Sequence, residues 1–178
     1  MLKPLLLSAA AALALSACAS TQADMQADAA MAAGDMTPTQ RGAYVEMAAA
    51  SDLFEIQSGR LAAQQGRSAA VRSFGQMLVD HHSQTTAQLT AAATASGVMP
   101  TPDLMPMQAR MITELRAASG SSFDQVFIRQ QVMAHEMALA LHTNYAQNGD
   151  TMTLRATAAA AAPIVRQLLD MARSMQRS

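Results

Sequence analysis

Small and apolar residues recur at helical spacing along four long segments of the chain. The pattern predicts long helices over residues 37–64, 68–96, 123–148 and 151–175, and a short helix over residues 107–118. Three prolines, at positions 100, 102 and 106, interrupt the pattern between the second and third long helices. Four long helices with one long middle connection predict an all-α, ferritin-like four-helix bundle whose crossover carries a short extra helix.

Residue types typical of helix ends support these boundaries. Thr37 with Pro38 and Gln40 fits an N-cap, a first-turn proline and a capping-box partner. Ser68 is expected to cap the second helix, and Gly97 to end it. Ser121 and Asp124 fit a capping box at the third helix. Pro163 falls inside the last helix, where we expect a kink.

The first 17 residues have the pattern of a secretion signal. A short positive start at Lys3 precedes an apolar run that is too brief to span a bilayer with ease, and Leu15-Ser16-Ala17-Cys18 follows. This motif resembles the lipobox of bacterial lipoproteins, which implies lipid attached to Cys18. We therefore expect a signal peptide at 1–17, a lipidated Cys18 with a disordered tether over 18–36, and a folded domain over 37–178. The alternative is simple cleavage that releases a soluble protein.

These features predict an envelope protein anchored to a membrane through Cys18. No Asp follows Cys18, so the resemblance to lipoproteins implies the outer membrane, with the domain facing the periplasm. The chain has 178 residues, 12 basic and 13 acidic side chains and a net charge of −1, so it lacks the basic surface that nucleic acid requires. It contains 1 Cys, 15 Met, 2 Tyr and no Trp. A disulfide is therefore not expected to contribute to stability.

Three helices each place a polar residue toward the predicted core at similar height. At 100° per residue, Glu55 falls among small residues of the first helix, His81 falls on the packed seam of the second, and His135 lies on the third. His82 is placed off that seam. One carboxylate and two imidazoles are suitable ligands for a single divalent ion such as Fe, Mn or Zn.

A buried hydrogen-bonded network is the alternative interpretation of these residues. A charged hydrogen bond from either imidazole would stabilise Glu55 without a metal. Asp80, Asp124 and His142 are expected to be secondary members of the polar core, Asp124 also serving in the capping box. A standard di-iron centre is not predicted, because Leu78 and Val132 stand where that pattern requires Glu.

Methionines in the proline-rich crossover suggest a further hypothesis, copper handling through thioethers. These are Met99, Met105, Met107 and Met111. Met is also a common filler of irregular core space. Nucleophile and phosphate-loop motifs are lacking, so the sequence does not indicate an enzymatic reaction.

Several segments together resemble one family. They are Phe54-Glu55-Ile56-Gln57-Ser58-Gly59-Arg60-Leu61-Ala62, Met77-Leu78-Val79-Asp80-His81, Phe123-Asp124 with Gln131, Ala134-His135-Glu136 with Ala138-Leu139, and Ala162-Pro163-Ile164-Val165. Over about residues 41–175 the chain resembles the Domain of Unknown Function 4142 family. The resemblance implies a secreted bacterial protein of ferritin-like architecture without an established activity.

The resemblance also implies which polar residues matter. The family's Glu, Asp-His pair and second His correspond to Glu55, Asp80 with His81, and His135. The last helix departs from the family, because Leu168-Leu169-Asp170 stands where the family has His-Leu before an acid. The leading functional hypothesis is a non-catalytic envelope or stress-related binding or scaffold protein. A mononuclear metal-binding protein or metalloenzyme is the second hypothesis, and Met-based copper handling is the third.

Overall fold

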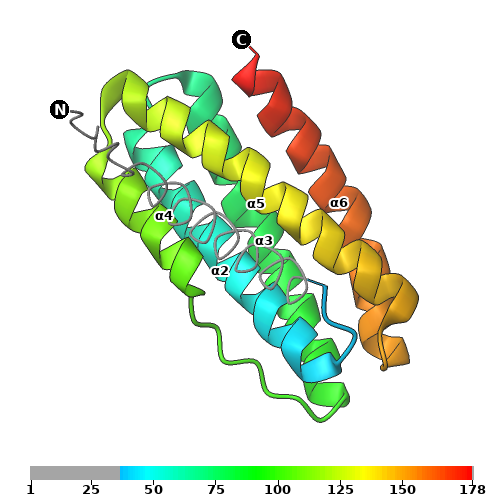
Figure 1. The fold of residues 1–178 in the computed structure, drawn as a ribbon. Helices are drawn as coiled ribbons and strands as arrows, with labels where there is room; N and C mark the ends of the chain where they lie inside the picture. Colours follow the sequence, from blue (N-terminus) through cyan, green and yellow to red (C-terminus); the bar gives the residue numbers. More distant parts are fainter. Residues whose placement is uncertain (1–36, 178) are drawn as a thin grey trace, which may run out of the picture. The chain divides into compact units, whose positions relative to one another are not determined.

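The structure is a computed structural model and describes residues 37–177. Its helices are α2 (Arg41–Gln65), α3 (Ala69–Ala95), α4 (Pro106–Ala117), α5 (Gly120–Asn148) and α6 (Met152–Gln176) (Figure 1). The part of the chain that is described is helical and contains no strand. The predicted signal peptide, the lipidated Cys18 and the tether up to residue 36 lie outside the described residues.

Four long helices form the bundle in two hairpins, α2 with α3 and α5 with α6. Each hairpin has a short turn, but α3 ends at the opposite end of the bundle from the start of α5 (Figure 1). The crossover therefore runs the length of the bundle and carries α4, which packs against α2 and α5. This confirms the predicted ferritin-like bundle with a helix in its crossover.

The first hairpin depends on two glycines that face each other. A Cβ atom on Gly59 would lie 2.7 Å from the carbonyl oxygen of Gly75, and one on Gly75 would lie 2.6 Å from that of Gly59. Real Cβ atoms do not approach a carbonyl so closely, so only glycine permits this helix spacing. The close approach fixes which face of α3 points toward α2.

The start of α2 differs from the prediction. The helix begins at Arg41 rather than at Thr37. The segment before it instead forms hydrogen bonds with residues near the turn that joins α5 to α6. Asn144 donates from Nδ2 to the carbonyl oxygen of Thr37 at 2.8 Å, and the backbone N–H of Asp150 donates to that of Thr39 at 3.0 Å. The predicted cap at Thr37 and Pro38 is therefore wrong.

The other helix ends confirm the sequence signals in part. Ser68 caps α3 by accepting from the N–H of Val71 at 3.2 Å, and Gly97 follows this helix with a φ of 74°. The predicted capping box of Ser121 and Asp124 is wrong, because α5 begins earlier, with Ser119 as its N-cap. Asp124 instead caps the start of the neighbouring helix α3. Its carboxylate accepts from the N–H groups of Arg67 and Ser68 at 2.8 and 2.9 Å.

Two large apolar clusters occupy the bundle, with a buried polar layer between them. One cluster gathers around Tyr44, Leu89 and Tyr145, and the other around Phe74, Phe123 and Phe127. The polar layer is formed by side chains of α2, α3 and α5 that are almost completely buried: Asp52, Glu55, Ser58, His82, Gln130, Gln131 and His135. A third, smaller cluster joins Phe54 to Met111 and Ile112 of α4.

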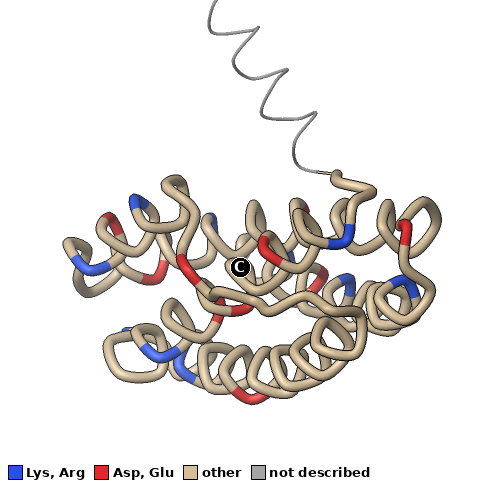
Figure 2. Tube along the Cα trace, turned by 90° about the horizontal axis from the view of Figure 1, so that it is seen from below, with Lys and Arg blue, Asp and Glu red and all other residues tan. Residues whose placement is uncertain are grey.

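The surface is mixed in charge. Acidic and basic positions of the described residues are spread over several helices rather than gathered on one (Figure 2). None of the helices among residues 37–177 is long and apolar enough to cross a bilayer.

Candidate metal centre

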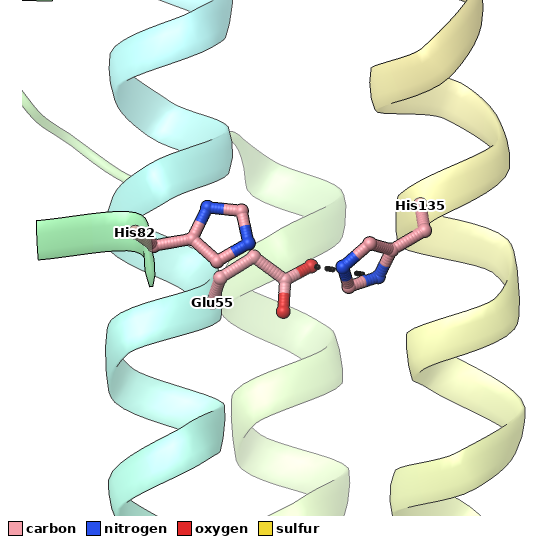
Figure 3. A group of neighbouring side chains, drawn as sticks. All are labelled: Glu55, His82 and His135. Atoms are coloured by element: carbon pink, nitrogen blue, oxygen red, sulfur yellow. Dashed lines mark ion pairs between the residues drawn. The ribbon is translucent and has the colours of Figure 1, made fainter. Parts of the chain in front are cut away.

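Three helices bring one carboxylate and two imidazoles together in the polar layer. Glu55 comes from α2, His82 from α3 and His135 from α5, and the Glu55 carboxylate lies between the two rings (Figure 3). One ligand atom from each residue lies within 4.8 Å of the others. The exposed fraction is 1% for Glu55, 4% for His82 and 1% for His135. Among the described residues, these three side chains form a group that could hold a metal ion.

The ligand atoms of this group lack hydrogen-bond partners. Both carboxylate oxygens of Glu55 and the Nε2 atoms of His82 and His135 are buried without a partner among the described residues. Oε1 of Glu55 lies 3.6 Å from Nδ1 of His135, too far for a good hydrogen bond. An unpartnered buried polar group costs about 1–3 kcal/mol, so four such atoms facing one another require a physical explanation.

The structure corrects one member of the predicted site. His82, not His81, lies beside Glu55 and His135, while His81 is half-buried and lies outside the group. The error lies in the heptad register assigned to α3, because a seam through positions 71, 75, 78, 82, 85, 89 and 92 fits the same spacing. Leu89 is buried on that seam, whereas Gln88 of the alternative seam is exposed. The apolar Leu89 and the small Gly75 are the signals that would have selected it.

Asp52 is a buried polar residue that the sequence reasoning missed. Its Oδ1 accepts from Nδ1 of His82 at 2.8 Å and from the hydroxyl of Thr85 at 2.9 Å, and its Oδ2 accepts from that of Thr86 at 3.1 Å. Asp52 stands three residues before Glu55 and so shares a face of α2 with it. That spacing was the available signal.

Burial and mutual charge shift the pKa values of this group. Burial raises the pKa of Glu55 to about 7, against the lowering effect of His82. Burial lowers the pKa of His135 to about 3, and the charge of His82 acts in the same direction. Burial also disfavours charge on His82, but its hydrogen bond to Asp52 and the charges of Glu55 and Asp52 outweigh this and raise its pKa. The protonation state of one member of the group therefore changes the pKa of the others.

A second polar cluster lies in the apolar cluster around Tyr44. The Tyr44 hydroxyl forms a hydrogen bond with Nδ1 of His142 at 3.1 Å, and its ring stacks on that of Tyr145 with centroids 3.9 Å apart. The Tyr145 hydroxyl in turn donates to Asp150 at 2.8 Å. His142 is buried, as the sequence predicted, but it belongs to this paired cluster and not to the group of Glu55.

The remaining predicted polar residues lie away from the centre. Asp80 is exposed and accepts from Gln76 at 3.0 Å, so its placement in the core is wrong. Asp124 caps α3 and is also no part of the buried layer. On α6, Leu168 and Leu169 are buried and apolar, and this helix supplies no member of the group.

The crossover methionines do not share one environment. Met99 is 76% exposed, and Met105 is also exposed. Met107 and Met111 pack with Phe54 and Ile112 in the apolar cluster against α4. Met107, which is half-buried, and the buried Met111 thus fill core space, as methionine commonly does.

A partly open cleft leads from the seam between α3 and α6 toward the polar layer. Its lining includes Asp52, His81, His82, His142, Thr157 and Ala161. His81, although outside the group, therefore lies along the approach to His82. Pro163 stands between lining residues of α6, which flank it at positions 161, 164 and 165.

Fold and site together define a ferritin-like helical bundle with a buried Glu-His-His group. The chain belongs to the family Domain of unknown function (DUF4142), whose model matches residues 21–175. No curated protein matches the chain.

Two solved structures show the same fold. One is described as CopM in the Cu(II)-bound form, with a TM-score of 0.66, 14% identity, and coverage of 78% of this chain and 96% of that one. The other is a DUF305 fragment from Deinococcus radiodurans, with a TM-score of 0.67, 15% identity, and coverage of 80% of this chain and 99% of that one.

Proposed function

We propose that this domain binds one divalent transition-metal ion through Glu55, His82 and His135. The observation that carries the proposal is the set of buried atoms without hydrogen-bond partners, two oxygens of Glu55 and one Nε2 atom of each histidine. Two imidazoles and one carboxylate form the ligand set of mononuclear non-haem iron sites and also suit manganese and zinc. Ligands held at about 2 Å from an ion lie about 3 Å apart, so small side-chain rotations would close the observed spacing around it.

The buried charges favour a divalent cation. Asp52 and Glu55 are both buried carboxylates, and no Lys or Arg is buried among residues 37–177. Two carboxylates and one divalent ion form a neutral group, which reduces the penalty for burying charge. A purely structural network would need hydrogen-bond donors for Glu55, but Nδ1 of His135 is 3.6 Å away and neither carboxylate oxygen has a hydrogen-bond partner among the described residues.

Access to the centre also separates metal binding from a closed structural core. A metal site requires a path from solvent, whereas a network that only fixes helix packing requires none. The cleft between α3 and α6 is lined by His82 and its partner Asp52, which supports a route from solvent to this side of the group.

The similar fold of CopM adds limited support. That structure is described as Cu(II)-bound, so this type of bundle carries a metal in another protein. At 14% identity the likeness concerns the fold alone, and the choice of ligands rests on the residues of this chain. Placement in the cell envelope through a lipid on Cys18 stays part of the proposal.

Metal content tests the proposed function directly. The purified protein, prepared without chelators and reconstituted anaerobically with Fe(II), Mn(II) or Zn(II), is expected to hold one equivalent of one of these ions by elemental analysis. His82→Gln should lose the ion because it removes a ligand. His81→Gln is the matched control, since it changes the neighbouring histidine of the same helix, and it should retain the ion.

Two results would contradict the proposal. One is protein without bound metal after every reconstitution. The other is equal loss of metal in His81→Gln and His82→Gln while both remain folded by circular dichroism, which would place the ligands elsewhere.

A further inference from the structure

We propose that Asp52 is a positioning residue of this centre, whose carboxylate keeps a proton on Nδ1 of His82 and thereby presents Nε2 to the metal ion. The inference rests on the proposed function and deepens it. It assigns a role to the buried carboxylate of Asp52, whose hydrogen bond to the group goes to His82.

The contacts of Asp52 distinguish it from a ligand. Its two oxygens receive three hydrogen bonds, from Nδ1 of His82 and from the hydroxyls of Thr85 and Thr86. These three contacts at 2.8 to 3.1 Å hold the carboxylate in one orientation. Glu55 shows the opposite pattern, with both oxygens free of partners. One acid of α2 is therefore held in place, while the other is available to an ion.

The bond to His82 determines which ring nitrogen is available. A carboxylate that accepts from Nδ1 requires the proton there, so the lone pair of the neutral ring is on Nε2. Nε2 of His82 is buried without a partner and belongs to the group with Glu55 and His135. Metal-binding histidines commonly donate their other N–H to a carboxylate, which orients the ring and increases its basicity.

The threonines give the arrangement rigidity. Thr85 and Thr86 lie one turn after His82 on the same helix, and each hydroxyl also lies near the carbonyl oxygen of His82, at 3.2 and 2.7 Å. The ring, the carboxylate and the two hydroxyls thus form one connected unit between α2 and α3. This unit fixes the ring of His82 before any ion arrives.

The first test reads the proton on His82 in the metal-free protein. Long-range ¹H–¹⁵N correlation spectra, recorded above the pKa of His82, are expected to show the proton on Nδ1. In Asp52→Asn the amide oxygen can still accept from Nδ1, so the proton should stay there. In Asp52→Ala no acceptor remains, and the ring should shift toward the Nε2–H form.

The second test measures Co(II) affinity by absorption and chelator competition. Loss of such an outer partner of a ligand weakens metal binding by about 10–100-fold, so we expect a fall in this range for Asp52→Ala. Asp52→Asn should fall between that variant and the parent, because it retains the hydrogen bond but lacks the charge. Asp80→Asn removes the same charge from an exposed position near His81 and should bind as the parent does.

The outcomes separate this inference from the proposed function. An Nε2–H ring in the parent, or Co(II) affinity within twofold of the parent in folded Asp52→Ala, would overturn the role of Asp52. A role in stability alone would lower the free energy of unfolding of both variants without moving the proton or the affinity, which also contradicts it. An Asp52-dependent Nδ1–H ring in a protein that binds no Co(II) would overturn the proposed function and leave only the orientation of His82.

Discussion

The bundle contains two buried histidine clusters that differ in how their polar atoms are paired. Around Tyr44, each polar side chain has a partner: Tyr44 is hydrogen-bonded to His142, and Tyr145 donates to Asp150. Around Glu55, two histidines and a carboxylate face one another with four atoms unpartnered. Tyr44 and His142 are buried, as are the three members of the Glu55 group. Both clusters use α2 and α5, and the Glu55 group adds His82 of α3.

The unpartnered polar atoms around Glu55 lower the stability of the fold, whereas the paired ones around Tyr44 do not. Paired buried groups contribute roughly 0.5–1.5 kcal/mol for each hydrogen bond, whereas unpaired ones destabilise the fold. Such unfavourable arrangements are typical of sites that bind something. The cluster of Tyr44 is therefore a reference against which the centre of Glu55 can be tested.

The largest expected effect is stabilisation by metal. With Zn(II) at 100 to 1,000 times its dissociation constant, the free energy of unfolding should rise by about 2.7–4 kcal/mol. His135→Gln should lose this increase, because it removes a ligand of the centre. His142→Gln is the matched control and should retain the increase, since it alters the paired cluster. Urea unfolding in the presence of Zn(II) or of chelator measures this increase. An equal increase in the two variants would contradict the distinction between the clusters.

The next effect is the dependence of stability on pH in metal-free protein. Burial lowers the pKa of His142 from 6.5 to about 4. Below pH 6.5 the unfolded chain therefore binds a proton that folded His142 does not, and stability falls as the pH drops from 6.5 toward 4. For one titrating group, the free energy of unfolding changes by at most about 1.4 kcal/mol per pH unit.

Glu55 should change the free energy of unfolding with pH in the opposite direction to His142. Because its pKa is raised from 4.5 to about 7, its contribution to stability is full below pH 4.5 and is lost as the pH rises through 7. Urea unfolding at pH 4 to 8 should show that His142→Gln removes an acid-side loss of stability, whereas Glu55→Gln removes a loss toward neutral pH. Slopes of the same sign for both residues would contradict this contrast.

Single substitutions should change stability in opposite directions. Tyr44→Phe keeps the ring stack but leaves Nδ1 of His142 without its hydrogen-bond partner, which should lower the free energy of unfolding by about 1–3 kcal/mol. Glu55→Leu removes an unpartnered buried carboxyl and should raise that of the metal-free protein by about 1–2 kcal/mol. Urea denaturation in the presence of chelator checks both. A destabilising Glu55→Leu in well-folded protein would show that Glu55 contributes to the fold.

The sequence predicted the helices better than it predicted the site. Spacing of apolar residues, Ser68 and Gly97 are local signals, and they located the bundle because helix formation depends mainly on nearby residues. The choice between His81 and His82 depended on which face of α3 meets α2. That face is set by the contact of Gly59 with Gly75, which joins two helices. Glu55 and His135 were placed correctly in the core.

Asp124 and Thr37 show the same limit at helix ends. Each fits a cap within its own segment, but each bonds to another part of the chain: Asp124 to the start of α3, and Thr37 to Asn144. Local propensity is a weak guide where a tertiary partner is available. Asp52 was missed for a related reason, because its partners Thr85 and Thr86 belong to a different helix.

The smallest expected effect concerns rate rather than equilibrium and tests the cleft between α3 and α6. Ala161 is nearly buried and lines this cleft, so Ala161→Leu should narrow the path to His82. Stopped-flow mixing with Co(II) should show several-fold slower binding, with an unchanged number of ions bound at the end. Ala160→Leu adds the same side chain at an exposed position of α6 and should bind at the parent rate.

A larger side chain near the core can itself destabilise a protein by about 1–3 kcal/mol, so a second variant is needed. Thr157→Leu also narrows the cleft. The hydroxyl of Thr157 donates to the carbonyl oxygen of Thr153 in its own helix, at 3.1 Å. Slow binding in both cleft variants, with melting curves close to that of the parent, would establish the path. Parent rates in both variants would mean that ions reach Glu55 from another side of the bundle.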